Sequence, residues 1–210
     1  MFGIHDLGLF IVSGLLLNMM PGPDSLLIMT RSASQGTRAG CMAALGIGSG
    51  TFVHVFAAAV GLSALLQTSA MAFSVVKYIG AAYILFLAFG LLRSKAGPAS
   101  VVTRSAPIPL TKVYAQGFLT NVLNPKVALF FLAFVPQFID AASPNKALAF
   151  IVLGCIFNIN GMLWCNGLAW VTARASARIK LDARLVTWVN RATGGLFVWL
   201  GIKLALSKNN

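Results

Sequence analysis

Two short segments that break a helix and carry a charge place the strongest constraint on this chain. The first is Asn18 to Asp24, with the sequence Asn-Met-Met-Pro-Gly-Pro-Asp, and the second is Asn121 to Lys126, with the sequence Asn-Val-Leu-Asn-Pro-Lys. Each interrupts an apolar stretch long enough to cross a bilayer. In lipid, such a break and such a charge are tolerated only where they face protein or a polar cavity. The two segments therefore predict a polar site buried inside a membrane protein.

The composition excludes an ordinary soluble domain. Hydrophobic residues make up 58% of the 210 residues and charged residues only 10%, and the mean hydropathy is +0.85. A formal net charge of +12 is also typical of proteins that bind nucleic acids. Here, however, the basic residues lie mainly between the apolar stretches, which is the pattern of an integral membrane protein. We therefore expect the lipid bilayer, and no nucleic acid, as a partner.

The apolar stretches predict an all-α integral membrane protein with six transmembrane helices. These six spans cover roughly 7–29, 40–66, 70–92, 113–138, 146–172 and 185–206. The longest connection, 93–112, contains three prolines and is the natural joint between two halves of three spans each. We expect residues 1–210 to form a single transmembrane domain, with halves of about 1–97 and 108–210.

The basic residues predict how the spans are oriented. Most of the 16 Lys and Arg residues fall in the first, third and fifth connections: Arg31, Arg38, Arg93, Lys95, Arg104, Lys112, Arg174, Arg178, Lys180 and Arg184. The positive-inside rule then places loops 30–39, 93–112 and 173–184 in the cytoplasm and both termini outside. A five-span arrangement, or a wrong assignment of the 70–92 span, would change this orientation.

The two halves are expected to be inverted repeats. Three spans is an odd number, so the halves enter the membrane from opposite sides and can be related by a pseudo-twofold axis in its plane. Pro23-Asp24 and Pro125-Lys126 both place a charge after a proline in the first span of a half, so that helices 1 and 4 are broken. Lys77 and Arg191 both open the third span of a half, although no single offset aligns both pairs. Broken helices in corresponding positions are typical of secondary transporters, whose substrate binds between them.

The prolines identify which backbone groups lose their partners. Proline has no N–H, so Pro21 and Pro23 free the carbonyls of Leu17 and Met19, and Pro125 frees that of Asn121. A helix that restarts after the break offers unpaired N–H groups and a partial positive charge, which suit a carboxylate. Asparagines beside the breaks could satisfy the freed groups or a ligand. The candidate binding site comprises Asn18, Pro21, Gly22, Pro23, Asp24, Asn121, Asn124, Pro125 and Lys126.

Asp24 is the only acid inside any predicted span. It could bind the ammonium group of a zwitterionic substrate, or it could carry a proton. Alternatively, Asp24 and Lys126 form an ion pair that only holds the two halves together. Lys126 is likewise a candidate contact for a substrate carboxylate. Asn18 and Asn124 could simply cap the broken helices.

Other polar residues inside the spans are weaker candidates. His54, in the middle of the second span, is a candidate for proton coupling, and its alternative is a hydrogen bond to a neighbouring helix. Asn158 and Asn160 are candidates for lining the substrate path, and hydrogen bonding between helices is their alternative. The three cysteines lack metal-ligand spacing, so neither a metal site nor a cofactor is expected.

The motifs in combination resemble one family. With Asn18-x-x-Pro21-Gly22-Pro23-Asp24 in the first span and Asn124-Pro125-Lys126 followed by Leu129-Phe130-Phe131 in the fourth, the chain resembles the LysE/RhtB family of amino-acid exporters over nearly its full length. The resemblance implies a bacterial inner-membrane secondary transporter that exports amino acids, driven by a proton or charge gradient. We expect alternating access as its mechanism and a second copy of the chain, in a homodimer, as a candidate partner. Members differ in substrate. The single intramembrane acid favours a small neutral amino acid, such as threonine, homoserine or leucine, because a cationic substrate would need a second carboxylate.

Functions of other classes are less consistent with the sequence. A passive channel stays open as an alternative, since broken half-helices also build selectivity filters. An intramembrane enzyme is disfavoured: glutamate is absent, which removes the His-Glu-x-x-His motif. Ser49 and His54, five residues apart, would lie about 140° apart on a helix and so could not form a dyad. A membrane scaffold is also disfavoured, because it would have no use for the free-energy cost of placing the charges of Asp24 and Lys126 inside the membrane.

Overall fold

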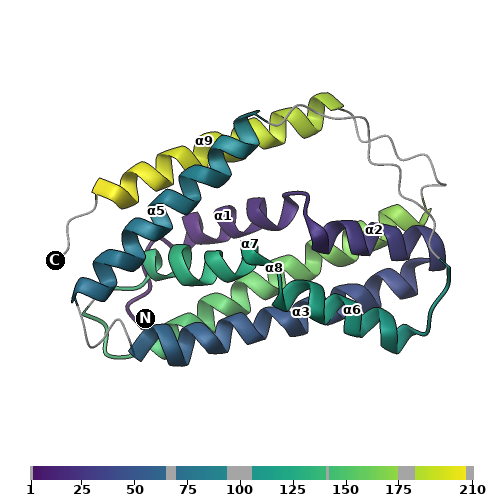
Figure 1. The fold of residues 1–210 in the computed structure, drawn as a ribbon, viewed down its shortest axis with the longest axis horizontal. Coiled ribbons are helices and arrows are strands. Elements are labelled where there is room, and N and C mark those ends of the chain that lie inside the picture. Colours follow the sequence, from purple (N-terminus) through teal and green to yellow (C-terminus); the bar gives the residue numbers. More distant parts are fainter. Residues whose placement is uncertain (1, 65–69, 94–105, 141, 175–182, 207–210) are drawn as a thin grey trace.

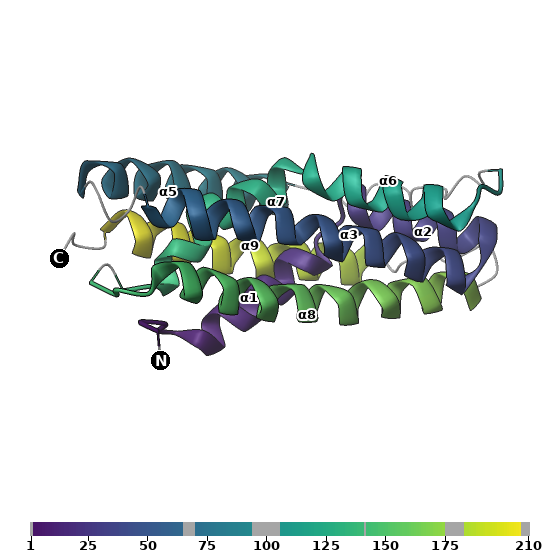
Figure 2. The same ribbon diagram turned by 90° about the horizontal axis from the view of Figure 1, so that it is seen from below.

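The computed structural model describes residues 2–64, 70–93, 106–140, 142–174 and 183–206. Within these ranges the chain folds into helices, and the one β-type contact is an isolated antiparallel bridge between Ile4 and Ile139. The predicted all-α class is therefore confirmed. Seen from two directions, the helices form an elongated bundle, with α5 and α9 packed along each other at its edge (Figures 1 and 2).

The helices follow the predicted apolar stretches, and two of those stretches are interrupted. In chain order the elements are α1 (Leu7–Met19), α2 (Pro23–Gln35), α3 (Thr37–Ala57) with the π-helical turn η1 (Ala58–Leu62), α5 (Ala70–Arg93), α6 (Leu110–Val122), α7 (Pro125–Leu129) with the π-helical turn η2 (Phe130–Phe134) and the 3-10 turn η3 (Val135–Phe138), α8 (Lys146–Arg174) and α9 (Ala183–Leu206). The axis bends by 55° between α1 and α2, and by 46° between α6 and the segment Pro125–Phe138.

Length and apolar composition give a lower count of spans than the sequence predicted. Among the described residues, Thr37–Leu62 and Lys146–Arg174 are long and apolar enough to cross a membrane, and the count rises to four if each bent pair is one span. The arrangement of six spans in two inverted repeats therefore stays a prediction. Much of the predicted loops 93–112 and 173–184 lies outside the described residues.

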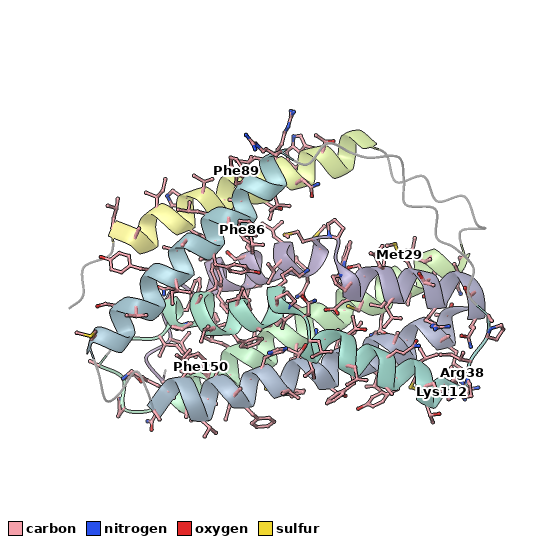
Figure 3. All side chains as sticks on the ribbon, in the orientation of Figure 1. Met29, Arg38, Phe86, Phe89, Lys112 and Phe150 are labelled. Carbon is pink, nitrogen blue, oxygen red and sulfur yellow. The ribbon has the colours of Figure 1, made fainter. Side chains whose placement is uncertain are left out.

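The bundle has two unlike ends. At one end, α2 and α8 finish and α3 and α6 begin (Figure 1), and the side chains of Arg38 and Lys112 lie there together (Figure 3). We call this the basic end. At the opposite end, which we call the aromatic end, α8 begins and Phe150 is buried. Basic residues from the first turns of α3 and α6 thus meet at one end of the molecule, and the predicted loop 30–39 is helical except at Gly36.

Two apolar clusters fill the bundle. The larger one, toward the aromatic end, is built around the buried rings of Phe10, Phe130, Phe131, Phe134, Phe138, Phe150 and Phe157. Ring centroids in it approach as closely as 4.5 Å, between Phe130 and Phe157. The smaller cluster, toward the basic end, contains Ile28, Ala43, Ala44, Ile47, Val113 and Ala169. Contacts of this kind hold helices together in lipid, where burial gains little from the exclusion of water.

Two glycines allow α3 and α6 to cross in backbone contact. A Cβ atom on Gly46 would overlap the backbone of Tyr114, and one on Gly117 would overlap the backbone of Ala43. Small residues permit this close approach of helices. Because α3 belongs to the first half of the chain and α6 to the second, the crossing fixes the halves against each other beside the two breaks.

Candidate functional site

The first break lies between α1 and α2. Pro23 is the first residue of α2 and Asp24 the second, so the carboxylate sits at the partially positive end of its own helix. On the other side of the break, the carbonyl groups of Leu17 and Met20 accept hydrogen bonds from Lys126 Nζ at 3.2 and 3.3 Å. The carbonyl of Leu17 is one that Pro21 was expected to free. The ammonium group of Lys126, from the second break, thus donates hydrogen bonds to carbonyl groups at the C-terminal end of α1.

The second break lies between α6 and α7. Asn124 caps α7, because its Oδ1 accepts a hydrogen bond from the backbone N–H of Lys126 at 3.0 Å. The carbonyl of Asn121, which Pro125 frees, accepts from the N–H of Asn124 at 2.9 Å and faces His54 Nε2 at 3.0 Å. A carbonyl oxygen can only accept, so Nε2 carries the hydrogen in this contact.

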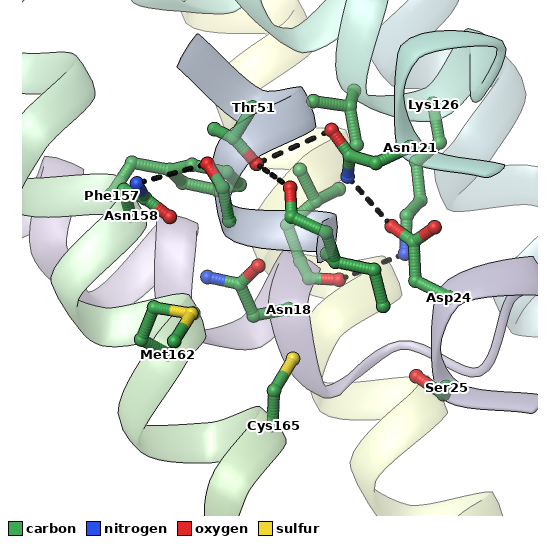
Figure 4. A pocket seen from close by; sticks show the side chains of 15 residues that line it. Asn18, Asp24, Ser25, Thr51, Asn121, Lys126, Phe157, Asn158, Met162 and Cys165 are labelled. Carbon is green, nitrogen blue, oxygen red and sulfur yellow. Dashed lines mark hydrogen bonds between the residues drawn. The ribbon is translucent and has the colours of Figure 1, made fainter. Parts of the chain in front are cut away.

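Asp24 connects the first break to the second. Its Oδ2 accepts a hydrogen bond from Asn121 Nδ2 at 2.9 Å (Figure 4) and a second one from Asn124 Nδ2 at 3.0 Å. The hydroxyl of Thr51, in α3, lies 3.3 Å from Asn121 Oδ1 and 3.1 Å from the carbonyl of Ile47. Each break therefore supplies groups that the other lacks, and α3 braces the second through Thr51 and His54.

The two central charges do not contact each other. Among the described residues, the ion pairs within 4.0 Å are those of His5 with Asp6 and with Asp140, far along the chain from the breaks. Lys126 is bonded to backbone carbonyls, and Asp24 to amides. Asp24 Oδ1 and Asn18 Nδ2 are buried and have no hydrogen-bond partner. Both charges are thus held in place by dipoles, and polar atoms remain that a ligand could bond.

A cavity lies between the breaks, α3 and α8. Its volume is about 30 Å³, which is enough for water but far below the volume of ligand pockets. Phe157 and Met162 of α8 form an apolar part of the lining across from Asn121 and Asp24, with Asn158 beside Phe157 (Figure 4). The lining residues are Leu17, Asn18, Asp24, Ser25, Ile47, Gly48, Thr51, Asn121, Lys126, Val127, Phe157, Asn158, Gly161, Met162 and Cys165. In this structure the cavity is therefore too small for an amino acid.

Comparison with known proteins identifies the family. The family model described as LysE type translocator matches residues 15–208. The chain belongs to the LysE type translocator family. It is 31% identical over 207 residues to an uncharacterized membrane protein of Pseudomonas aeruginosa, covering 97% of this chain and 96% of that protein. No solved structure matches.

Two further relatives carry a more specific name. The chain is 28% identical to the leucine efflux protein of Enterobacter sp. (strain 638), over 97% of each chain. It is 26% identical to the leucine efflux protein of Salmonella typhimurium, over 97% of this chain and 96% of that protein. The resemblance to the family is thereby confirmed, and the chain is a membrane protein of a transporter family rather than of an enzyme family.

Within this LysE type chain, the structure gathers most of the predicted site residues. Asn18, Asp24, Asn121, Lys126 and Asn158 line the cavity. Pro21, Gly22, Pro23 and Pro125 form the breaks themselves, and Asn124 bonds to Asp24 without lining the cavity.

His54 and Asn160 stand apart from the cavity. His54 reaches it only through the carbonyl of Asn121. Asn160 is outside the lining, and its Nδ2 is buried without a partner. Asn158 donates to the carbonyl of Gly48 at 3.2 Å, the interhelical bond that was its alternative interpretation, and it also lines the cavity.

Sequence reasoning missed several residues of this LysE type site. Thr51 lies three residues before His54 and so faces a similar side of α3, which is a signal that could have found it. Phe157, Met162 and Cys165 carry no such signal, because an apolar residue of α8 looks the same whether it faces the cavity, another helix or lipid.

Proposed function

We propose that this chain is a secondary transporter that exports a small neutral amino acid from the cytoplasm, with leucine, threonine and homoserine as candidates. One observation carries the proposal: a single buried carboxylate, Asp24, lines a cavity between two broken helices and keeps one oxygen unbonded. The leucine efflux proteins, which match over nearly the whole chain, support the direction and the class of substrate.

The proposed arrangement in the membrane has six spans in one domain. These are α1 with α2, α3 with η1, α5, α6 with α7 to η3, α8, and α9, divided into inverted halves at 93–112. The two bent helices, each at the start of a half, support this repeat. The gathering of basic residues at one end supports a cytoplasmic basic end and outward termini in the bacterial inner membrane.

The cavity offers complementary groups for a zwitterion. Asp24 Oδ1 is the proposed partner of the substrate ammonium group, and Asn18 Nδ2, which is buried and unbonded, is a donor for its carboxylate. Lys126 adds a positive charge beside the same carboxylate. The substrate side chain then faces the apolar wall of Phe157 and Met162. Among the described residues no second carboxylate lines the cavity, so a cationic side chain would remain unpaired.

Transport requires the cavity to open on each side in turn. A cavity of about 30 Å³ holds no amino acid, so in the proposed cycle the cavity must widen before substrate can bind. Proton coupling is assigned to Asp24, because a proton and a substrate ammonium group would compete for the same carboxylate. That competition would link the inward movement of a proton to the outward movement of substrate.

Efflux of the twenty amino acids and homoserine from loaded cells tests this proposal. Cells that express the chain should release one or a few small neutral amino acids faster than control cells, and they should release lysine and arginine no faster. In vesicles, substrate on the opposite side should accelerate exchange, because a carrier returns faster when loaded. Flux that ignores substrate on the opposite side would instead support the passive channel, and no accelerated release of any amino acid would refute export.

A further inference from the structure

A second polar cluster lies in the described part of the molecule, two turns along α2 from Asp24. At its centre is Arg31, whose residue surface is only 8% exposed. Its guanidinium group donates to Gln116 Oε1 from Nη2 at 2.9 Å and from Nε at 3.2 Å. It also donates from Nη1 to Gln35 Oε1 and to the carbonyl of Ala106, both at 3.4 Å. Every acceptor is neutral, and within the described residues no carboxylate lies within 4.0 Å of Arg31.

These bonds join the two halves of the chain at the basic end. Arg31 and Gln35 belong to α2 in the first half, whereas Gln116 belongs to α6 in the second half. Gln35 also exchanges two hydrogen bonds with the backbone of Ile108, just before α6, at 2.8 and 3.3 Å. The cluster thus fastens α2 to α6 and to the segment that enters α6.

The cluster lies directly along the helix from the cavity. Asp24, Ile28, Arg31 and Gln35 follow at spacings of four, three and four residues, so they occupy one face of α2. By helical rise, Arg31 lies roughly 10 Å beyond Asp24. Between them, Ile28 is fully buried in the small apolar cluster with Ile47 and Val113. A route from the cavity to the basic end along this face therefore passes a thin apolar layer and then Arg31.

We infer that Arg31 is the latch of the gate at the basic end, a positioning residue that holds α2 against α6 while the cavity is closed to that side; this inference rests on the proposed function. Bonds from a guanidinium group to neutral amide oxygens are weaker than a pair with a carboxylate. Such a latch can release in every transport cycle, whereas a buried ion pair at the same place would hold the gate closed. The neutral Gln116 is therefore the expected partner for a contact that must open.

Opposite changes at Gln116 test the latch. Gln116→Glu gives Arg31 a carboxylate partner and should hold the gate closed, whereas Gln116→Ala removes the main acceptor and should open it. The reporter is Cys165, a native thiol that lines the cavity, in a Cys41→Ala, Cys155→Ala background. A membrane-impermeant maleimide is added to inside-out vesicles, so that it meets the side assigned to the basic end. Gln137→Glu and Gln137→Ala are matched controls, because Gln137 bonds the carbonyl of Ala133 in its own segment.

The expected result is a divergence of labelling rates. Relative to the Gln137 variants, labelling of Cys165 should fall roughly tenfold in Gln116→Glu and rise roughly tenfold in Gln116→Ala, which corresponds to ~1.4 kcal/mol in the gate equilibrium for each. Equal rates, or a shift of both variants in the same direction as a merely structural role would give, would overturn the latch. Labelling needs no substrate: if the rates diverge while the efflux screen finds no exported amino acid, the latch stands and the proposed substrate class fails.

Discussion

The two helix breaks are built from similar residues but hold different kinds of group. At the first break, the negative end of α1 holds the ammonium group of Lys126, and the positive end of α2 carries the carboxylate of Asp24. At the second, the end of α6 is bonded to His54, and the start of α7 is capped by the amide of Asn124. The first break therefore stabilises full charges, and the second is completed by an imidazole and an amide.

This difference shows how two charges can be kept in lipid without an ion pair. A direct Asp24–Lys126 pair would neutralise both groups and leave little for a substrate to bind. Helix ends and amides stabilise each charge separately, so both can face the same cavity. We therefore expect substitutions of the charged Asp24 and Lys126 to reduce stability or efflux more than substitutions of the neutral groups at the second break.

The largest effect is expected from Lys126→Met. It removes the donor that Leu17 and Met20 share; the carbonyl of Leu17 keeps the N–H of Met20 as a donor at 3.2 Å, whereas that of Met20 loses Lys126, at a cost of ~1–3 kcal/mol for one unsatisfied group. Thermal unfolding in detergent should occur at a lower temperature, and efflux should be lost. Lys126→Arg, which keeps a donor and a charge, is the matched control and should retain more stability. Wild-type stability in Lys126→Met would show that the first break needs no cation.

Asp24→Asn should reduce efflux strongly, with a much smaller effect on stability. The asparagine oxygen can still accept hydrogen bonds from Asn121 and Asn124, so the brace between the breaks survives. The negative charge that would bind a substrate ammonium group or a proton is lost. Efflux by a folded, inserted protein should fall roughly tenfold or more, since bonds to charged groups are worth ~1.5–3 kcal/mol. Unchanged efflux would remove Asp24 from the mechanism.

A smaller effect is expected at the neutral break from Asn124→Ala. This change removes the cap of α7 and one of the two amide donors to Asp24, and a lost cap costs typically ~1 kcal/mol. Efflux should fall by a few-fold and remain measurable. Asn124→Asp restores the cap but places a second negative charge beside Asp24, so it should be worse than alanine for efflux. The reverse order would mean that the cap, and not the charge at Asp24, governs the site.

The sequence predicted the breaks well, because proline chemistry is local. The freeing of the carbonyls of Leu17 and Asn121 followed from Pro21 and Pro125 alone. The partners of those carbonyls could not be predicted, since they depend on how α1, α3 and α6 cross in space. For the same reason the sequence did not predict the Arg31–Gln116 contact. The positive-inside rule counts Arg31 as one basic residue and says nothing about its hydrogen-bond partners. The apolar wall of the cavity has no signature in a chain whose helices are apolar on most faces.

His54→Gln gives the smallest expected effect and the sharpest test of the neutral break. If its role is to donate to the carbonyl of Asn121, His54→Gln should keep a donor in reach and retain most of the efflux, whereas His54→Leu should lose several-fold. The pH dependence of efflux should then be the same in wild type and His54→Gln, because the titrating group of the proposed cycle is Asp24. Failure of His54→Gln together with a changed pH profile would assign proton coupling to the histidine, and the second break would then hold a charge like the first.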